Sequence, residues 1–225
     1  MQIGRNLFPS PLLYNSLRRR SSSSSTASHQ FRKMTSEAGS TEKDAPSFQS
    51  IGVKNTDINV GPGVTLTPEK KVLVGSVLDL FEGHPTLKHL TLWQPTATFE
   101  DPIAIAKGYD SYAAQWYGLT VLFQPIKIRS HTVTSGGNPI DVTLSNAYTI
   151  KGIKSEHVID STVSIHVGAD GKIEKVQDKW DMKIPLMGTS ISDAFRKLSA
   201  GTTSKLVTVP KTEEEDKKMQ RERGD

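Results

Sequence analysis

The most regular alternation of apolar and polar residues lies in the stretch KIEKVQDKWDMKI, residues 172–184. From residue 176 onward, every second residue falls on one face, and that face is apolar except for Asp178. A period of two predicts a β-strand with one buried face. An isolated ionised carboxylate is costly to bury, so we expect Asp178 to be paired, to be protonated through a raised pKa, or to open on a polar cavity. Asp178 is therefore the first candidate functional residue.

Earlier in the chain, apolar residues recur at helical spacing. Thr67-Pro68-Glu69 predicts a helix start, because Thr can cap, Pro suits the first helical position and Glu favours the positive end of the helix dipole. Gly83 and Pro85 end this helix, and a short helical segment over 86–92 leads to a short strand over 97–99. A third helix follows Gly108 and stops before Pro125, and its apolar face carries Tyr109, Tyr112, Trp116, Leu119 and Phe123.

The period changes to two after residue 125. Strands are predicted over 126–134, 140–150 and 158–167 as well as 172–184, with glycine-containing turns between them. Helices followed by a meander of antiparallel strands predict an α+β domain, in which the helices pack on one face of a curved sheet. Beyond the meander, residues 190–198 predict a short helix and 206–209 an edge strand.

Composition divides the chain into four parts. Residues 1–34 are rich in Arg and Ser and hold no acid, which is typical of a mitochondrial or plastid transit peptide, although two prolines interrupt any amphipathic helix. The alternatives are a disordered tail or an upstream extension to a true start at Met34, so we expect a mitochondrial protein or otherwise a cytoplasmic one. Residues 35–66 predict a linker, 67–210 the folded domain, and 211–225 a charged disordered tail.

Charge and cysteine content exclude several classes of function. The formal net charge is +4, but the first 36 residues contribute +6, so the remainder carries −2. The folded part therefore gives no reason to expect nucleic-acid binding. No stretch approaches the roughly 18 to 20 apolar residues of a membrane span, so no membrane partner is expected. The chain has no Cys, and no pair of His residues has metal-ligand spacing with a carboxylate, so we expect no metal and no cofactor.

Two short motifs carry a family resemblance. The predicted short strand ends in Phe99-Glu100-Asp101-Pro102 ahead of a glycine-led helix, and the last long strand ends in Asp178-Lys179-Trp180-Asp181. Over residues 68–184 this order resembles the SnoaL-like branch of the nuclear-transport-factor-two-like (NTF2-like) superfamily, and most closely its uncharacterised fungal members. The resemblance implies a cone-shaped, antiparallel or mixed sheet with about three helices on its concave face. It also implies a mouth that receives an apolar ligand, and a homodimer.

The resemblance places Asp178 at the acid/base position of SnoaL-like cyclases, where an apolar pocket would raise its pKa. His157 and Asn146 interrupt apolar faces of neighbouring strands, so they could line the same cavity, with His157 as a second catalytic group. Each of them could instead be a satisfied core residue. The full set of predicted ligand contacts comprises Asn146, Tyr148, Trp180, Tyr112, Trp116 and Asp101, with core packing as the alternative for the aromatic residues and a turn or cap role for Asp101.

The leading hypothesis is a pocket domain that binds, and could isomerise, cyclise or dehydrate, a small apolar metabolite with a carbonyl group. As an enzyme it would be a lyase or isomerase with an Asp acid/base. The alternative is a non-catalytic module that forms homodimers or binds a protein partner. The family's more specific sites are not evident: the Tyr–Asp oxyanion pair of ketosteroid isomerases, the Asp-Arg-Asp set of limonene-epoxide hydrolases and the Tyr–His pairs of scytalone dehydratase. Fold resemblance alone does not select the reaction.

Overall fold

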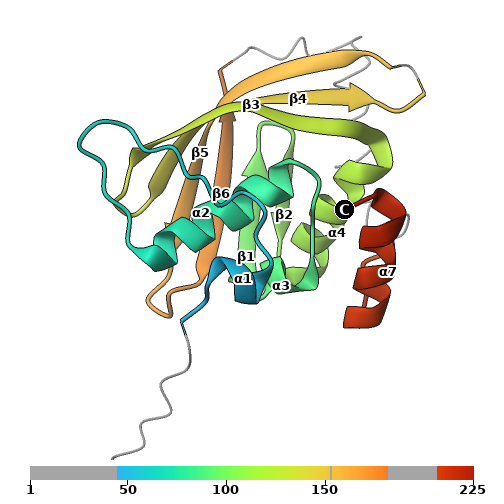
Figure 1. Cartoon of the computed structure of the whole chain (residues 1–225), viewed down its shortest axis with the longest axis horizontal. Coiled ribbons are helices and arrows are strands. Elements are labelled where there is room, and N and C mark those ends of the chain that lie inside the picture. Colours follow the sequence, from blue (N-terminus) through green and yellow to red (C-terminus); the bar gives the residue numbers. More distant parts are fainter. Residues whose placement is uncertain (1–44, 153, 182–206) are drawn as a thin grey trace, which may run out of the picture. The chain divides into compact units, whose positions relative to one another are not determined.

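The computed structural model describes residues 45–152, 154–181 and 207–225 (Figure 1). Among these residues, three helices come first, two strands and a fourth helix follow, and four strands then succeed one another before a last helix. The helices are α1 (Phe48–Ile51), α2 (Pro68–Phe81), α3 (Leu87–Leu90), α4 (Tyr109–Leu122) and α7 (Glu213–Arg223). The strands are β1 (Trp93–Asp101), β2 (Ala104–Lys107), β3 (Phe123–Ser135), β4 (Ile140–Ile150), β5 (Glu156–Val167) and β6 (Ile173–Trp180).

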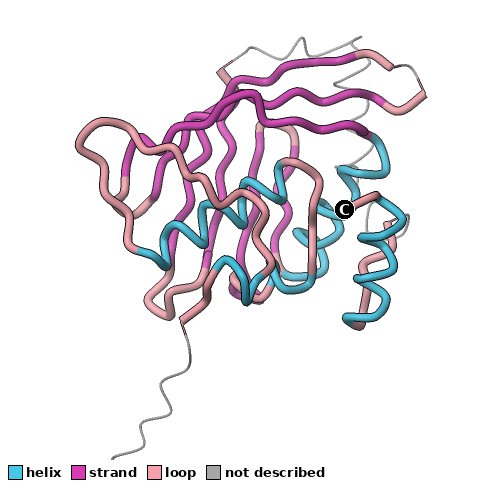
Figure 2. The backbone as a smooth tube through the Cα atoms, viewed as in Figure 1, coloured by secondary structure: helices cyan, strands magenta, loops and turns pink. Residues whose placement is uncertain are grey.

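The strands form one mixed sheet in the order β2-β1-β6-β5-β4-β3. Neighbours run antiparallel except β1 and β6, the first and the last strand in the chain, which pair in parallel. The strands curve around α2 and α4 (Figures 1 and 2). The predicted α+β class, with a curved sheet and helices on one face, is confirmed. The short strand β2 and the parallel pairing of β1 with β6 were not specified by the sequence pattern.

Helix α2 begins as the sequence predicts, with the Thr67 hydroxyl accepting from the Lys70 amide at 3.3 Å and Pro68 in the first turn. All residues from 72 to 81 are buried, so the helix is covered on more than one side. The sheet covers one side and residues 45–66 cross the other. At Gly75 a Cβ atom would lie 2.4 Å from the carbonyl oxygen of Asn55, so only glycine allows this close approach.

Residues 45–66, which we call the strap, are not the free linker that composition predicts. The buried Asp79 carboxylate of α2 accepts from the backbone amides of Lys54 at 2.8 Å and Asn55 at 2.9 Å. The buried ring of His89 lies against the same carboxylate, with Nε2 and Oδ2 3.1 Å apart. Further along, backbone hydrogen bonds join residues 59 and 61 of the strap to Val133 of β3. A buried acid on α2 thus fixes the strap at its centre, and apolar strap residues, among them Val53, add packing against the core.

The predicted disordered tail, 211–225, is also structured. Thr212 caps α7, acids fill its first turn and arginines its last, an arrangement that suits the helix dipole. The Asp216 carboxylate is buried and accepts from the Tyr117 hydroxyl at 2.7 Å and from the Leu87 amide at 2.9 Å. Composition suggested a solvated segment, but these bonds hold α7 on α4 and α3. Of the predicted edge strand over 206–209, the described residues 207–209 form no strand, and the helix predicted over 190–198 lies outside the described residues.

An aromatic cluster joins α4 to β1 and α2. Trp116 of α4 is fully buried, and its ring centre lies 4.5 Å from that of Phe99, 5.3 Å from Phe81 and 5.9 Å from Trp93. These contacts fix the helix face that looks toward the sheet. Among the described helices, none is long and apolar enough to cross a membrane.

Candidate functional site

A small cavity lies between α2, α4 and the inner face of the sheet. Its volume is about 10 Å³, close to the space that one water molecule needs. Seven of the nine lining residues are buried, and the half-buried Asp101 and Trp180 form the part of the wall nearest to solvent. The lining residues are Phe81, Phe99, Asp101, Gln115, Trp116, Leu119, Tyr148, Asp178 and Trp180.

Asp178 lies on the inner face of β6, as the alternation predicts, and is 5% exposed. The Trp180 indole N–H donates to its Oδ2 at 2.7 Å. Its Oδ1 is buried and meets no donor in hydrogen-bonding geometry among the described residues. Burial raises the pKa of this carboxyl to about 6, and the nearby Asp101 carboxylate adds to the rise, although Ser161 and Trp180 oppose it. Asp178 can therefore hold or release a proton near neutral pH.

Asp101 places a second carboxyl in the same cavity wall. It ends β1, and its Oδ1 accepts from the backbone amides of Ile103 at 2.8 Å and Ala104 at 2.6 Å, so it does have the predicted turn role. Burial nevertheless raises the pKa of Asp101 to about 6, because the two amides only partly offset the loss of water. The turn thus fixes the position of a carboxyl that also lines the cavity.

Five of the eight predicted site residues line this cavity: Asp178, Asp101, Tyr148, Trp116 and Trp180. Tyr148 comes from β4, and burial, followed by the Asp178 charge, raises the pKa of its hydroxyl well above the ordinary value. Its ring packs edge-on against Phe123 at 5.4 Å. These residues come from four elements that the fold brings together, so the grouping is a property of the fold.

The other three predicted residues do not line the cavity. The Asn146 amide is buried and donates to the Phe81 carbonyl at 2.8 Å, which fastens the end of α2 to the sheet. His157, at the end of β5, lies 2.9 Å from the Ser155 hydroxyl. Tyr112 stacks on Trp93 in the core and donates to a backbone carbonyl of β1. For Asn146 and Tyr112 the structure shows the core contacts that the sequence left open as alternatives, and His157 interacts with its own turn.

Gln115 is a lining residue that sequence reasoning missed. It is 5% exposed and brings an amide, both donor and acceptor, to the cavity from α4. A signal was present, because Gln115 lies three residues after Tyr112 and four before Leu119, on the apolar face of the predicted helix. Phe81, Phe99 and Leu119 complete the apolar part of the wall.

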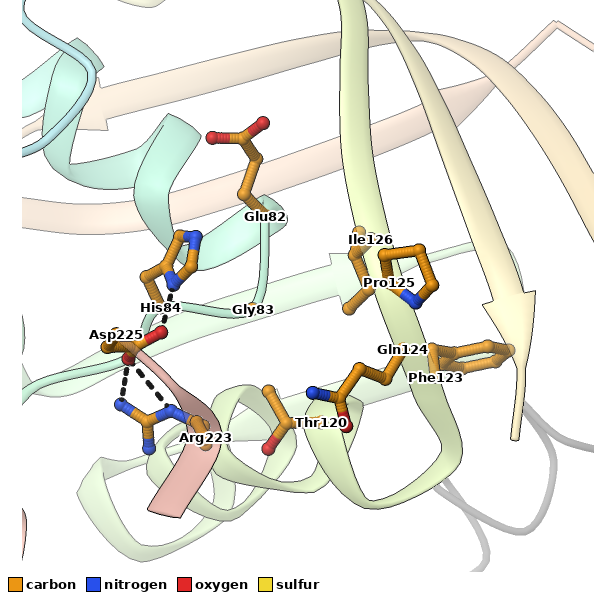
Figure 3. A pocket seen from close by; sticks show the side chains of 10 residues that line it. All are labelled: Glu82, Gly83, His84, Thr120, Phe123, Gln124, Pro125, Ile126, Arg223 and Asp225. Carbon is orange, nitrogen blue, oxygen red and sulfur yellow. Dashed lines mark hydrogen bonds and ion pairs between the residues drawn. The ribbon is translucent and has the colours of Figure 1, made fainter. Parts of the chain in front are cut away.

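A larger cavity of about 140 Å³ lies elsewhere, where α7 meets the ends of α2 and α4 (Figure 3). Asp225 dominates its polar wall, accepting from His84 Nδ1 at 2.5 Å and from the Arg223 guanidinium at 2.8 Å. These donors lower the pKa of Asp225 to about 2 despite its burial. Glu82 accepts from Ile128 and Asn55. These charged groups already have partners, and their contacts join separate segments of the chain. We therefore interpret this cavity as part of the packing of α7 and not as a reaction site.

The described residues contain no group of three or more His, Asp or Glu side chains that could hold a metal ion. The site must therefore be judged by its two carboxyls, its amide and its aromatic wall.

No family model and no curated protein matches this sequence. Solved structures do resemble it. An NTF2-like protein of unknown function from Exiguobacterium sp. 255-15 shares 19% identity over 49% of this chain and 99% of its own, with a TM-score of 0.42. A steroid delta-isomerase from Pseudomonas aeruginosa shares 13% over 64% and 98%, with a TM-score of 0.47. A protein with a ketosteroid isomerase-like fold from Catenulispora acidiphila, solved with trimethylamine, shares 14% over 47% and 82%, with a TM-score of 0.41. At these values the likeness gives no information on ligand or reaction.

Proposed function

We propose that this is a SnoaL-like pocket domain in which Asp178 transfers a proton to or from a small carbonyl compound. The observation that carries the proposal is the pair of carboxyls in one cavity wall, Asp178 buried and Asp101 half-buried, each with a pKa raised to about 6. A carboxyl with a pKa near the working pH acts efficiently both as base and as acid.

The bonding of Asp178 suits it to act as the base. Trp180 fixes Oδ2, and we assign Oδ1, which meets no donor in hydrogen-bonding geometry among the described residues, to the contact with a ligand. Oδ1 takes a proton from the carbon next to the carbonyl, and the electron pair of the broken C–H bond moves to the carbonyl oxygen to give an enolate. Gln115 provides an amide donor in the same wall for that oxygen. Return of the proton to another carbon would be an isomerisation, and loss of a neighbouring hydroxyl as water would be a dehydration.

The size of the cavity limits how a ligand enters. A volume of about 10 Å³ holds no metabolite, so side chains must move when a ligand binds. Among the lining residues Trp180 and Asp101 are half-buried and the others are buried. A ligand that enters beside these two residues therefore displaces fewer buried side chains. The flat rings of Phe81, Phe99 and Trp116 would then pack against an apolar ligand.

The test is hydrogen–deuterium exchange at an enolisable carbon. The full chain is mixed with 2-tetralone, an apolar ketone, in deuterated buffer, and loss of the C–H signal is followed by NMR. We expect the parent to accelerate exchange. The acceleration by Asp178→Asn should be smaller by a factor of at least about 100. Glu174→Gln, which removes an exposed carboxylate of the same strand, is the matched control and should exchange like the parent. Equal rates for the parent and Asp178→Asn would refute the proposed role of Asp178.

A further inference from the structure

The charge of the cavity wall is one-sided. Of the nine lining side chains, two are carboxyls, and none is Lys, Arg or His. No described cation is among the causes that shift the pKa of Asp178 or of Asp101. A phosphate or carboxylate ligand in this cavity would place its negative charge beside the two carboxylates, and no described cation of the wall would offset the repulsion. Such repulsion is strong in a poorly solvated site. The described wall therefore selects against anions.

The remaining wall is largely aromatic. Phe81, Phe99, Trp116, Tyr148 and Trp180 provide five rings around the two carboxyls. A ring face attracts a cation within about 6 Å of its centre, and the attraction grows when water is excluded. Carboxylates and the faces of aromatic rings both attract positive charge. A wall that contains both therefore favours a cation.

We propose that the cavity binds a ligand that carries a protonated amino group, held by the Asp101 carboxylate and by the faces of the surrounding aromatic rings. The inference rests on the pocket of the proposed function and narrows its ligand to a carbonyl compound with an amine. Asp101 suits the binding role because it is half-buried and its Oδ1 is already fixed by two backbone amides. Asp178, which is deeper and whose Oδ1 meets no donor in hydrogen-bonding geometry among the described residues, keeps the proton-transfer role.

An ammonium group also matches the cavity in size. Its –NH₃⁺ head is about as large as the single water molecule that the space accommodates. The head can thus occupy the cavity while the rest of the ligand extends toward Trp180 and solvent. An apolar ligand without a polar head would instead place carbon against two carboxyls.

Binding of the amine must depend on pH. The titratable groups that face the two carboxyls, among the described residues, are each other, Tyr148 from β4 and Asp181 further along the chain; α2 and α4 add only uncharged side chains. Tyr148 stays protonated throughout, because its pKa is raised further above the ordinary value. Between pH 7.5 and pH 5, protonation of one carboxyl with a pKa of about 6 weakens amine binding by about tenfold, and by about 100-fold if both must be ionised.

The experiment compares three probes of similar size, isobutylamine, isobutanol and isobutyrate, against the full chain. The readout is the ¹⁵N–¹H indole signal of Trp180, whose N–H donates to Asp178. Trp180→Phe assigns the signal, and the indole of Trp93, which does not line the cavity, is the internal reference. We expect isobutylamine to bind at least about tenfold more tightly than isobutanol, and isobutyrate to cause no shift.

Asp101→Asn should abolish the preference for the amine, because an amide keeps the acceptor for the turn but removes the charge. Glu174→Gln, which removes an exposed carboxylate of β6 that does not shift the pKa of either cavity carboxyl, should retain the preference. Equal affinity for amine and alcohol, tighter binding of isobutyrate, or an amine preference that survives Asp101→Asn would each overturn the inference. Those outcomes leave the exchange test of the proposed function untouched. Conversely, an Asp101-dependent amine site without ketone exchange would support this inference and remove the proposed reaction.

Discussion

Neutralising Asp178 provides the most direct test of its environment. In Asp178→Asn the new amide oxygen can still accept from the Trp180 indole, so shape and one hydrogen bond are retained while the charge is lost. A carboxyl whose pKa is raised by burial is a group whose ionisation opposes folding. The substitution should therefore stabilise the domain at neutral pH.

The magnitude follows from the pKa. A rise from 3.8 to about 6 in the folded state corresponds to roughly 3 kcal/mol of lost stability once Asp178 is ionised. The new –NH₂ group lacks a good acceptor, which costs about 1 kcal/mol or more. We expect a net gain of about 1 to 2 kcal/mol at pH 7, or about 2 to 8 °C in Tm for a domain of this size.

The gain must depend on pH. Well below pH 3.8, Asp178 is protonated in both the folded and the unfolded chain, so the electrostatic gain disappears. As pH rises from about 4 to 6, only the unfolded chain ionises readily, so parent stability falls and the gain of Asp178→Asn grows; above about pH 7 it is constant. The assay is urea unfolding at several pH values, with Glu174→Gln as the exposed control that should change stability little. A pH-independent difference, or a loss above about 1 kcal/mol at pH 7, would contradict the argument.

Three further predictions concern the fold. Tyr117→Phe should destabilise by about 1.5 to 3 kcal/mol in urea unfolding, because it removes the donor to buried Asp216, whereas Tyr109→Phe should be nearly neutral. Gly83→Ala should lower Tm more than Gly152→Ala. Both residues have positive φ, but a Cβ at residue 83 would lie 2.9 Å from a neighbouring side chain, whereas at residue 152 it would meet nothing within 4 Å. Equal Tm losses would argue against this packing. Asp79→Asn should speed amide hydrogen exchange in the strap, because it weakens the bonds to the Lys54 and Asn55 amides. The parent should lose the same protection in acid, as pH falls through the lowered pKa of Asp79. Unchanged exchange rates would mean that other contacts hold the strap.

The sequence predicts most of the sheet because alternation and turn residues agree there. Strand β4 has the predicted bounds, 140–150, since its alternation is strong and the turn before it is rich in glycine. Strand β2 was missed because its four residues bury only one side chain well. The strap and α7 were missed for another reason. Tertiary contacts hold them, among them those of the buried acids Asp79 and Asp216, and average composition does not reveal such contacts.

The candidate site also combines features that local sequence patterns predict with features that depend on the assembled fold. Periodicity alone locates Asp178, because a carboxylate among apolar residues of one strand face is a local signal. Asp101 was named from resemblance, and its location in the same wall depends on the parallel pairing of β1 and β6, which no local pattern encodes. His157 shares a strand face with apolar residues but lies at the strand end, where a neighbouring Ser155 meets it. Periodicity gives the face of a residue, and only the assembled sheet gives its neighbours.

The parallel pair β1 and β6 also fixes when the site can form. β1 is the first strand of the sheet to be synthesised and β6 the last, so Asp101 leaves the ribosome long before Asp178. Contacts between such distant segments are the slowest to form, because a long loop must close first. A nascent chain that ends before β6 therefore contains one carboxyl without its companion, and the proposed site is complete only when that strand docks.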